Sequence, residues 1–265
     1  MLEYCTLFDS GYLTQGLALY ESINHHHTDY RLHILALCKR SLDVLRRLDL
    51  PNTTLYSVAD VETPALRGLR STLSNFEYAC ALKPSFMLCV LHEAEYVVYV
   101  DADSYFYNTG WHAIGPLRAD DSIPVAVTPH RFAPAHERFI VNGNYNAGVI
   151  YATRNGTRCL EDWERRCVTN RQGRMTDQRL LNDWPEKWRA HVITHKGLNL
   201  APWNQEQYTY DVRRGGVCFV NTQPVILYHF HQGLGTHYNL APFVKDYLYK
   251  PYREALARAA EKAHS

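Results

Sequence analysis

The chain has 265 residues, of which 46% are hydrophobic and 21% are charged, and its formal net charge is +1. This composition is sufficient for one α/β domain with a sizeable buried core. Because a nearly neutral chain has no overall field that would attract DNA or RNA, we expect no nucleic-acid partner. The 19 tyrosines, 14 histidines and 5 tryptophans favour a wet cleft lined by aromatic side chains.

The seven cysteines are scattered, and no CxxC pair occurs among them. This pattern gives no support to a zinc ribbon or a thioredoxin-type redox site, and it is typical of a reducing compartment. The opening stretch, MLEYCTLFDS, has neither a basic region nor a long apolar region, and no apolar run reaches the ~18 residues that a membrane-spanning helix needs. We therefore expect a cytoplasmic protein, free or at the inner face of the membrane.

Strands and helices alternate along the first hundred residues. Runs rich in β-branched and aromatic residues predict strands at 3–8, 31–38, 53–58 and 95–100. Helical periodicity between them predicts helices at 13–23, 41–48 and 75–93, the last interrupted or restarted at Pro84. This order predicts an α/β fold with a mostly parallel central sheet flanked by helices.

The second half is less regular. Strands are expected at 123–129, 146–153 and 225–231, and an amphipathic helix at 156–170. Because no repeat or linker separates the halves, the sequence predicts a single domain. Its parts are a nucleotide-binding half at about 1–110, an acceptor and catalytic half at about 111–245, and a C-terminal helix at about 246–265.

The stretch EYVVYVDADSYFY ends an apolar strand in two carboxylates, Asp101 and Asp103. Ligands of open α/β sheets collect at the carboxyl ends of such strands. In extended geometry both carboxylates point the same way, with Ala102 opposite. Two converging anions favour a hard divalent cation, Mn²⁺ or Mg²⁺, bridging them to a substrate phosphate.

The same stretch permits other interpretations. DADS resembles the nucleophile motif of phosphatases, which predicts a phosphohydrolase with Asp101 as the nucleophile. That motif normally follows the first strand of its fold, whereas here it follows about the fourth. A third alternative is a non-catalytic protein that binds a nucleotide-sugar or a glycan.

Several motifs, taken in order, resemble those of GT-A glycosyltransferases. They are similar to family 8, the type that includes glycogenin and bacterial lipopolysaccharide galactosyltransferases, and the resemblance spans most of the chain. TLFDSGY resembles the first strand and turn of that family, and VYVDADSYFY resembles its metal-binding DxD strand. The resemblance implies a nucleoside pocket at Thr6, Asp9 and Tyr12, a basic residue facing the donor at Lys83, and donor and metal contacts at Asp101, Ala102 and Asp103.

Further motifs resemble the sugar-binding part of the family. YNAGVIYAT resembles FNAGV, which implies that Asn146, Ala147 and Gly148 line the sugar pocket. TDQRLLND resembles DQDxLN, which implies that Asp177 and Gln178 lie near the anomeric carbon. Because an amide under the sugar is typical of the retaining enzymes, retention is favoured, with Asp177 holding sugar hydroxyls; an exchange of roles within this pair stays open.

LYHFHQG resembles the family's HYxG, whose histidine completes the metal shell. The closing family motif, HxxGxxKPW, is not intact, because Gln232 stands where its glycine is expected and Gly233 follows. His229 and His231 share one face of the expected strand, so either histidine is a candidate ligand, with His229 favoured. Two carboxylates and an imidazole suit Mn²⁺ better than Mg²⁺.

Two loops offer acceptor contacts, because tryptophan stacking and amide hydrogen bonds are common in carbohydrate sites. The acceptor candidates are His130, Arg131, Asn199, Trp203 and Asn204. The segment 243–262 mixes tyrosine and leucine with basic residues, which predicts either peripheral contact with an anionic membrane or a docking helix.

Taken together, the motifs predict a metal-dependent glycosyltransferase. It would move a sugar from a nucleotide-sugar, with UDP as the expected nucleotide, to a glycan or lipid-linked glycan. The bacterial motifs, among them GLNLAPWN, favour a role in surface polysaccharide synthesis.

Overall fold

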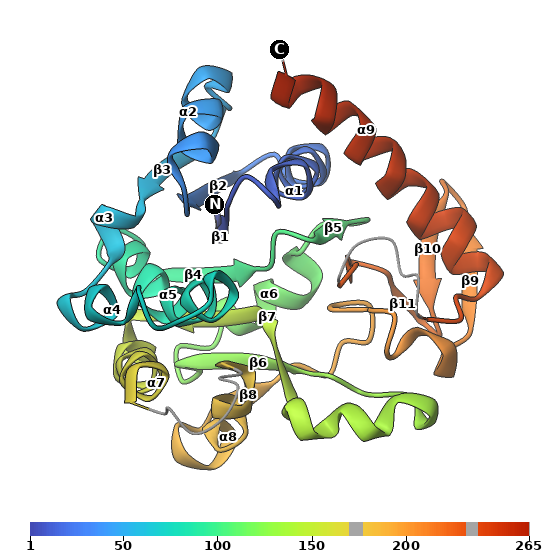
Figure 1. Ribbon diagram of the computed structural model, residues 1–265. Helices are drawn as coiled ribbons and strands as arrows, with labels where there is room; N and C mark the ends of the chain where they lie inside the picture. The colour runs from blue at the N-terminus through green and yellow to red at the C-terminus, as the bar shows by residue number, and fades with distance from the viewer. Residues whose placement is uncertain (170–176, 232–237, 265) are drawn as a thin grey trace.

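The computed structural model describes residues 1–169, 177–231 and 238–264, so Gln232 and Gly233 lie outside the described residues. Its centre is a seven-stranded sheet in the order β3-β2-β1-β4-β7-β6-β8 (Figure 1). The strands are β3 (Thr53–Ser57), β2 (Tyr30–Ala36), β1 (Leu2–Phe8), β4 (Tyr96–Val100), β7 (Tyr145–Thr153), β6 (Val125–Pro129) and β8 (His191–Val192).

All strand pairs in this sheet are parallel except the two that involve β7, which runs antiparallel to β4 and to β6. The predicted mostly parallel α/β sheet is thus confirmed. The reversal of β7 has a consequence for the site, because it places the start of β7 beside the end of β4. The backbone N–H of Asp101 donates to the carbonyl of Gly148 at 2.9 Å across this junction.

Helices cover both faces of the sheet. Side chains alternate along β1, so that Tyr4 and Phe8 join one core cluster while Cys5 and Leu7 join the other. The first cluster lies under α1 (Leu13–His26) and α9 (Lys250–His264), and the second under α5 (Asn75–Leu91) and α7 (Thr157–Thr169). The shorter helices are α2 (Lys39–Leu48), α3 (Val58–Val61), α4 (Pro64–Leu69), α6 (Trp111–Arg118) and α8 (Trp184–Lys187).

Helix α5 corrects one expectation, because it is continuous and Pro84 lies inside it. A proline in a helix interior costs about 3 kcal/mol. Both halves of α5 are buried, and it packs against β4 and α7, so tertiary packing offsets that cost. The helix begins at a capping box formed by Ser74 and Glu77.

Two small sheets complete the fold. Strand β12 (Leu227–His229) pairs antiparallel with β5 (Ser104–Phe106), which places His229 opposite Ser104. This pairing brings β12, from late in the chain, beside the residues that follow β4. A three-stranded sheet of β9 (Tyr210–Arg213), β10 (Val217–Val220) and β11 (Gln223–Pro224) comes directly before β12 in the chain.

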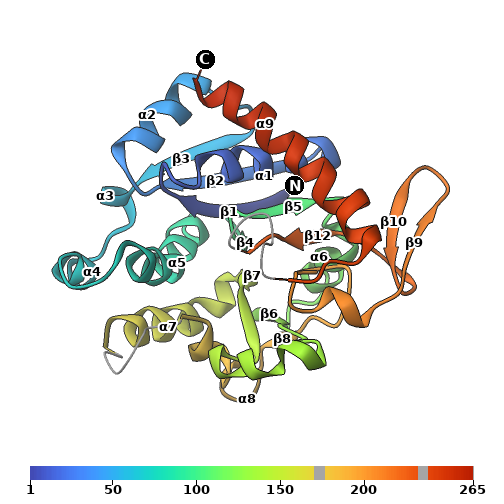
Figure 2. The ribbon, with the colours of Figure 1, turned by 45° about the vertical axis from the view of Figure 1, so that its right-hand side comes forward.

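The C-terminal segment is a helix packed on α1, as Figures 1 and 2 show, and it follows a π-helical turn at Val244–Tyr249. Tyr252, Ala255 and Ala259 are buried, and Arg258 forms an ion pair with Glu21. Docking therefore accounts for the apolar side of α9, and membrane contact through its basic residues stays a prediction. Among the residues described, no helix has the length and apolar character that crossing a membrane requires.

Candidate metal and donor site

A cavity of about 950 Å³ opens at the carboxyl ends of β1 and β4. We call it the cleft. Most of the residues singled out in the sequence line it, although they come from distant parts of the chain. They are Asp9, Tyr12, Lys83, Asp101, Ala102, Asp103, His130, Asn146, Asp177, Gln178, Trp203, His229 and His231.

Asp101, Asp103 and His229 form a cluster in the cleft whose potential ligand atoms all lie within 4.8 Å of one another. His229 Nε2 lies 3.2 Å from Asp103 Oδ1 and 3.8 Å from Asp101 Oδ2. The two carboxylates follow β4 directly, and the histidine is brought to them by the pairing of β12 with β5. The predicted alternate, His231, lies outside this cluster, with its ring centroid 6.0 Å from that of His229.

The electrostatics of the cluster are those of buried opposite charges. Burial disfavours the charged form of His229, but the Asp103 carboxylate outweighs it, and the net effect is a raised pKa. Burial likewise works against the Asp103 carboxylate, and His229 lowers its pKa overall. An anionic pair beside an imidazole is a donor set that fits a divalent cation.

Lys83 is buried between two carboxylates. Its Nζ lies 3.1 Å from Asp101 Oδ1 and 3.1 Å from Asp177 Oδ2, and 5.1 Å from the centre of the Tyr99 ring. Burial alone would lower the pKa of this lysine, but Asp101 and Asp177 raise it well above its ordinary value. The ammonium is therefore a fixed positive charge that joins Asp101 to Asp177 in the cleft.

Two amide side chains, those of Gln178 and Asn146, lie close together in the cleft. Gln178 lies on a short 3-10 helix at Asp177–Leu181, and its backbone N–H donates to Asp177 Oδ1 at 2.9 Å. Asn146 Nδ2 lies 3.4 Å from Gln178 Oε1 and 3.3 Å from His130 Nε2. Burial lowers the pKa of His130 to about 4, so this imidazole is neutral at physiological pH.

The turn after β1 carries the nucleoside candidates. Asp9 Oδ1 accepts a hydrogen bond from the Gly11 N–H at 2.8 Å, and Tyr12 lines the cleft with 43% of its surface exposed. Thr6 is fully buried inside β1 and does not line the cleft. Ala147 and Gly148 are likewise behind the lining, where their carbonyls accept from Lys83 and from the Asp101 N–H.

The acceptor candidates divide into two groups. His130 and Trp203 line the cleft, whereas Arg131, Asn199 and Asn204 do not. Arg131 donates to the carbonyls of His195 and Leu198, and Asn204 donates to the carbonyl of His130. Buried backbone carbonyls need such donors, so these polar side chains hold the loop rather than face the cleft.

An aromatic wall on one side of the cleft was missed by the sequence analysis. Phe132 stacks on His130 with ring centroids 4.6 Å apart, and Phe139 follows on a 3-10 helix at Pro134–Asn142. The other aromatic side chains of this wall are His136 and Tyr238, and Phe76 lines the cleft from the start of α5. Its signal in the sequence is the run of histidine and phenylalanine from His130 to Phe139, directly after β6.

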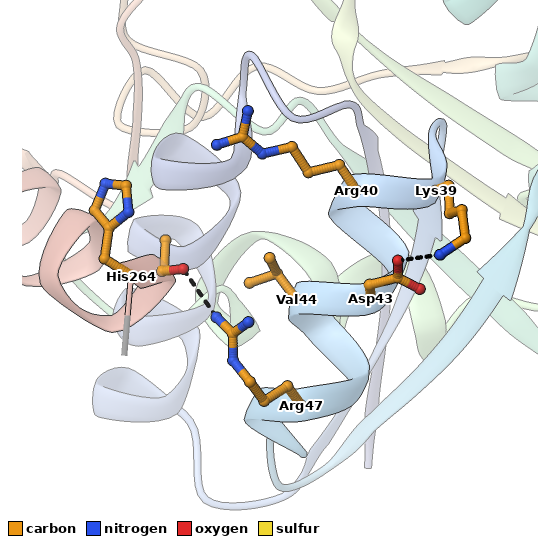
Figure 3. Close-up of a pocket in the computed structure, with 7 residues that line it drawn as sticks. Lys39, Arg40, Asp43, Val44, Arg47 and His264 are labelled. Atoms are coloured by element: carbon orange, nitrogen blue, oxygen red, sulfur yellow. Dashed lines mark hydrogen bonds and ion pairs between the residues drawn. The ribbon is translucent and has the colours of Figure 1, made fainter.

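A second pocket lies between α2 and the end of α9 (Figure 3). Arg47 Nη2 donates to the backbone carbonyl of Ala263 at 2.9 Å, and Lys39 pairs with Asp43 at 2.5 Å. The hydrogen bond from Arg47 fastens the end of α9 to α2, whereas the Lys39–Asp43 pair lies within α2. None of the sequence motifs contributes to this pocket.

Comparison with known proteins identifies the family of the chain. No protein-family model matches it. The uncharacterized protein YfnF of Bacillus subtilis (strain 168) is 30% identical over 244 residues, which cover 86% of this chain and 80% of YfnF. The chain belongs to the YfnF family. A second protein of that organism, YfnD, is 26% identical to this YfnF-family chain over 246 residues, covering 86% of the chain and 76% of YfnD.

Solved structures identify the fold of this YfnF-family chain. The galactosyltransferase LgtC, in complex with donor and acceptor sugar analogues, matches with a TM-score of 0.62 and 15% identity over 97% of this chain and 96% of LgtC. Mouse xyloside xylosyltransferase 1 matches with a TM-score of 0.58 and 10% identity over 91% of this chain and 99% of that chain. The fold is therefore the GT-A fold of glycosyltransferases, which confirms the resemblance seen in the sequence.

Proposed function

We propose that the protein is a metal-dependent glycosyltransferase that moves a sugar from a UDP-sugar to a glycan or lipid-linked glycan acceptor. The observation that carries this proposal is the cluster of Asp101, Asp103 and His229 in the cleft of a GT-A fold. LgtC, which shares the fold, has been solved with donor and acceptor sugar analogues. A cleft of about 950 Å³ has room for both substrates at once.

The metal proposal rests on the donor set. Asp101, Asp103 and His229 would hold the ion, and their mixed oxygen and nitrogen atoms suit Mn²⁺ better than Mg²⁺. When bound, a divalent ion supplies positive charge against the leaving diphosphate. Lys83 adds a permanent positive charge from the protein itself, 3.1 Å from Asp101.

The nucleoside would bind at the turn between β1 and α1. The exposed ring of Tyr12 offers a stacking surface for the base, and Asp9 offers a carboxylate that accepts from a base N–H. Both residues lie on the same cleft as the carboxylates after β4, so base and diphosphate would be held by one continuous surface. Uracil as the base follows from the resemblance of TLFDSGY to family 8.

Retention of configuration is the proposed stereochemical outcome. Inversion needs a general base, usually a carboxylate, beside the acceptor hydroxyl. Among the described residues of the lining, the acidic side chains are Asp9, Asp101, Asp103 and Asp177. Asp177 is neutralised by Lys83, and none of the others belongs to the aromatic wall. Gln178 would then lie under the sugar, with Asp177 holding its hydroxyls.

The acceptor would bind against the aromatic wall that contains Phe132, next to the Trp203 ring. Aromatic faces stack on the apolar faces of sugar rings, and His130 and His136 offer hydrogen bonds at the same surface. A glycan or lipid-linked glycan in surface polysaccharide synthesis fits this surface. We place the reaction in the cytoplasm, with peripheral membrane contact through the C-terminal helix.

Thermal unfolding with a ligand panel tests the proposal. UDP, GDP, CDP and inorganic phosphate are each added with Mn²⁺, Mg²⁺ or EDTA. A ligand at about 100 times its Kd stabilises by roughly 2.7 kcal/mol, or about 5–10 °C for a domain of this size. We expect this shift for UDP with Mn²⁺, its loss in EDTA and in Asp103→Asn, and its retention in the control Asp43→Asn on α2. A shift with phosphate alone would favour the phosphohydrolase with Asp101 as nucleophile.

A further inference from the structure

Asn199 is a buried amide with an unusual set of partners. It is fully buried, its backbone is left-handed with φ of 59°, and it lies behind the lining of the cleft. Its Nδ2 donates to Thr128 Oγ1 at 3.0 Å and to Asn146 Oδ1 at 3.1 Å. The nearby Asn204, equally buried, instead donates to backbone carbonyls. Asn199 thus hydrogen-bonds to two side chains, and one of them, that of Asn146, lines the cleft.

A backbone N–H group fixes which way the hydrogen bonds run between the amide side chains of Asn199, Asn146 and Gln178. The N–H of Gly148 can only donate, and it donates to Asn146 Oδ1 at 2.9 Å. Asn146 Oδ1 therefore faces Gly148 and Asn199, and Asn146 Nδ2 faces the cleft. There it lies 3.3 Å from His130 Nε2 and 3.4 Å from Gln178 Oε1. One orientation of each amide satisfies every contact in this chain.

The last hydrogen bond of this series orients the side chain of Gln178. With Asn146 Nδ2 as the donor, the carbonyl oxygen of the Gln178 side chain is turned toward Asn146. His130, which is neutral, accepts from the same amide and holds Asn146 from the other side. Loss of either donor to Asn146 Oδ1 would allow Asn146 to turn over, and Gln178 would turn with it.

We propose that Asn199 is a positioning residue that sets, through Asn146, the direction of the Gln178 carboxamide in the cleft. The catalytic consequence rests on the proposed glycosyl transfer, whereas the orientation itself does not. Asn199 does not itself line the cleft, so it would bind neither donor nor acceptor. Its contribution would therefore appear in the turnover number and leave the Michaelis constant for the donor unchanged.

Asn199→Asp is the informative substitution. Aspartate has the same shape as asparagine and tolerates left-handed backbone, but it loses the hydrogen bond that the Asn199 amide donates to Thr128 Oγ1. It cannot donate to Asn146 Oδ1, and its charge repels that oxygen. We expect kcat for release of UDP from the donor to fall about 10- to 100-fold, with the KM for the donor within about twofold. The matched control is Asn221→Asp, at another left-handed asparagine (φ 52°) outside the cleft, with kcat unchanged.

A double-mutant cycle separates positioning from a general structural role. In a Gln178→Ala background, Asn199→Asp is expected to lower kcat by less than about twofold further, because the group that it orients has gone. A purely structural loss would multiply with the effect of Gln178→Ala and would overturn the proposal. Thr128→Val provides a second route if Asn199→Asp folds poorly, since it removes one partner of Asn199 and keeps the side-chain volume. Its expected effect on kcat is smaller, about threefold, and no change in kcat would again contradict the proposal.

A spectroscopic readout makes the test independent of turnover. In protein labelled with ¹⁵N-glutamine, the side-chain amide signals of Gln178 are assigned by their loss in Gln178→Ala. They are expected to move in Asn199→Asp and to stay in place in Asn221→Asp. Moved signals in a protein that turns over no donor would contradict the proposed function and support the positioning role. Unmoved signals and unchanged kcat in an active enzyme would overturn the positioning role alone.

Discussion

Lys83 Nζ lies 3.1 Å from Asp177 Oδ2, and this ion pair joins helix α5 to the 3-10 helix that carries Gln178. The same ammonium lies 3.1 Å from Asp101 Oδ1 at the end of β4. One buried cation thus links the Asp101 carboxylate at the end of β4 to the Asp177 carboxylate on the 3-10 helix.

Replacement of Lys83 by methionine is expected to destabilise the fold strongly. Asp177 would be left buried without its cation, and removal of one partner of a buried ion pair costs about 3–5 kcal/mol. Urea unfolding of Lys83→Met measures this loss directly. The control is Lys39→Met on α2, whose pair with Asp43 is exposed and is worth less than about 1 kcal/mol. Equal losses in the two variants would show that Lys83 is not a structural cation.

Gly148 is expected to tolerate no side chain. A Cβ at this position would lie 2.6 Å from Asn146 Oδ1 and 2.8 Å from the ring of His229. Gly148→Ala therefore displaces either the Asn146 amide or the His229 ring, at a cost of about 1–3 kcal/mol. We expect the variant to lose the stabilisation by UDP with Mn²⁺, measured by thermal unfolding. Gly68→Ala on α4, where a Cβ meets no atom within 4 Å, is the control and is expected to behave like the wild type.

The sequence was sufficient for the framework of the site. The apolar strand before Asp101, the turn at Asp9 and the late strand before His229 all predicted side chains at strand ends, and the structure brings them to one cleft. Asp9 and Asp101 follow the parallel strands β1 and β4, whose carboxyl ends meet at one edge of the sheet, so local patterns were enough for these two residues. His229 reaches the same cleft through the antiparallel pairing of β12 with β5, which is a long-range contact.

Features that depend on contacts between distant segments could not be predicted from local sequence patterns. The reversed direction of β7, which brings Asn146 beside the DxD residues, depends on pairing with β4 and has no local signature. The continuity of α5 through Pro84 depends on packing that outweighs helix propensity. Asn199 and Arg131 read as acceptor contacts because asparagine and arginine are common in sugar sites, but burial gives them other partners.

Stability is expected to fall in mild acid because of His130. Burial lowers its pKa to about 4 from an ordinary value of 6.5. In the window between pH 6.5 and 4 the unfolded chain takes up a proton that the folded protein does not, so the free energy of unfolding falls as the pH falls. The contribution of this histidine between pH 7 and pH 5 is about 2 kcal/mol.

Comparison of wild type with His130→Gln checks this effect by urea unfolding at pH 7 and pH 5. The variant is expected to lose less stability than the wild type on acidification, by about the amount that His130 contributes. His26 and His195, whose pKa values are also lowered to about 4, keep their own acid sensitivity in both proteins. An identical pH dependence in the two proteins would mean that His130 takes up its proton equally in both states.

Turnover of a nucleotide-sugar tests the central claim most directly. Purified protein is incubated with a panel of UDP-sugars and glycan acceptors, with Mn²⁺ or EDTA, and the release of UDP is followed over time; in samples without a glycan, water takes the sugar. We predict metal-dependent release of UDP from at least one donor, abolished by EDTA and by Asp103→Asn and retained in Asp43→Asn. Release that is insensitive to EDTA and to Asp103→Asn would contradict this account. So would the absence of UDP release from every donor, together with release of phosphate from simple phosphomonoesters.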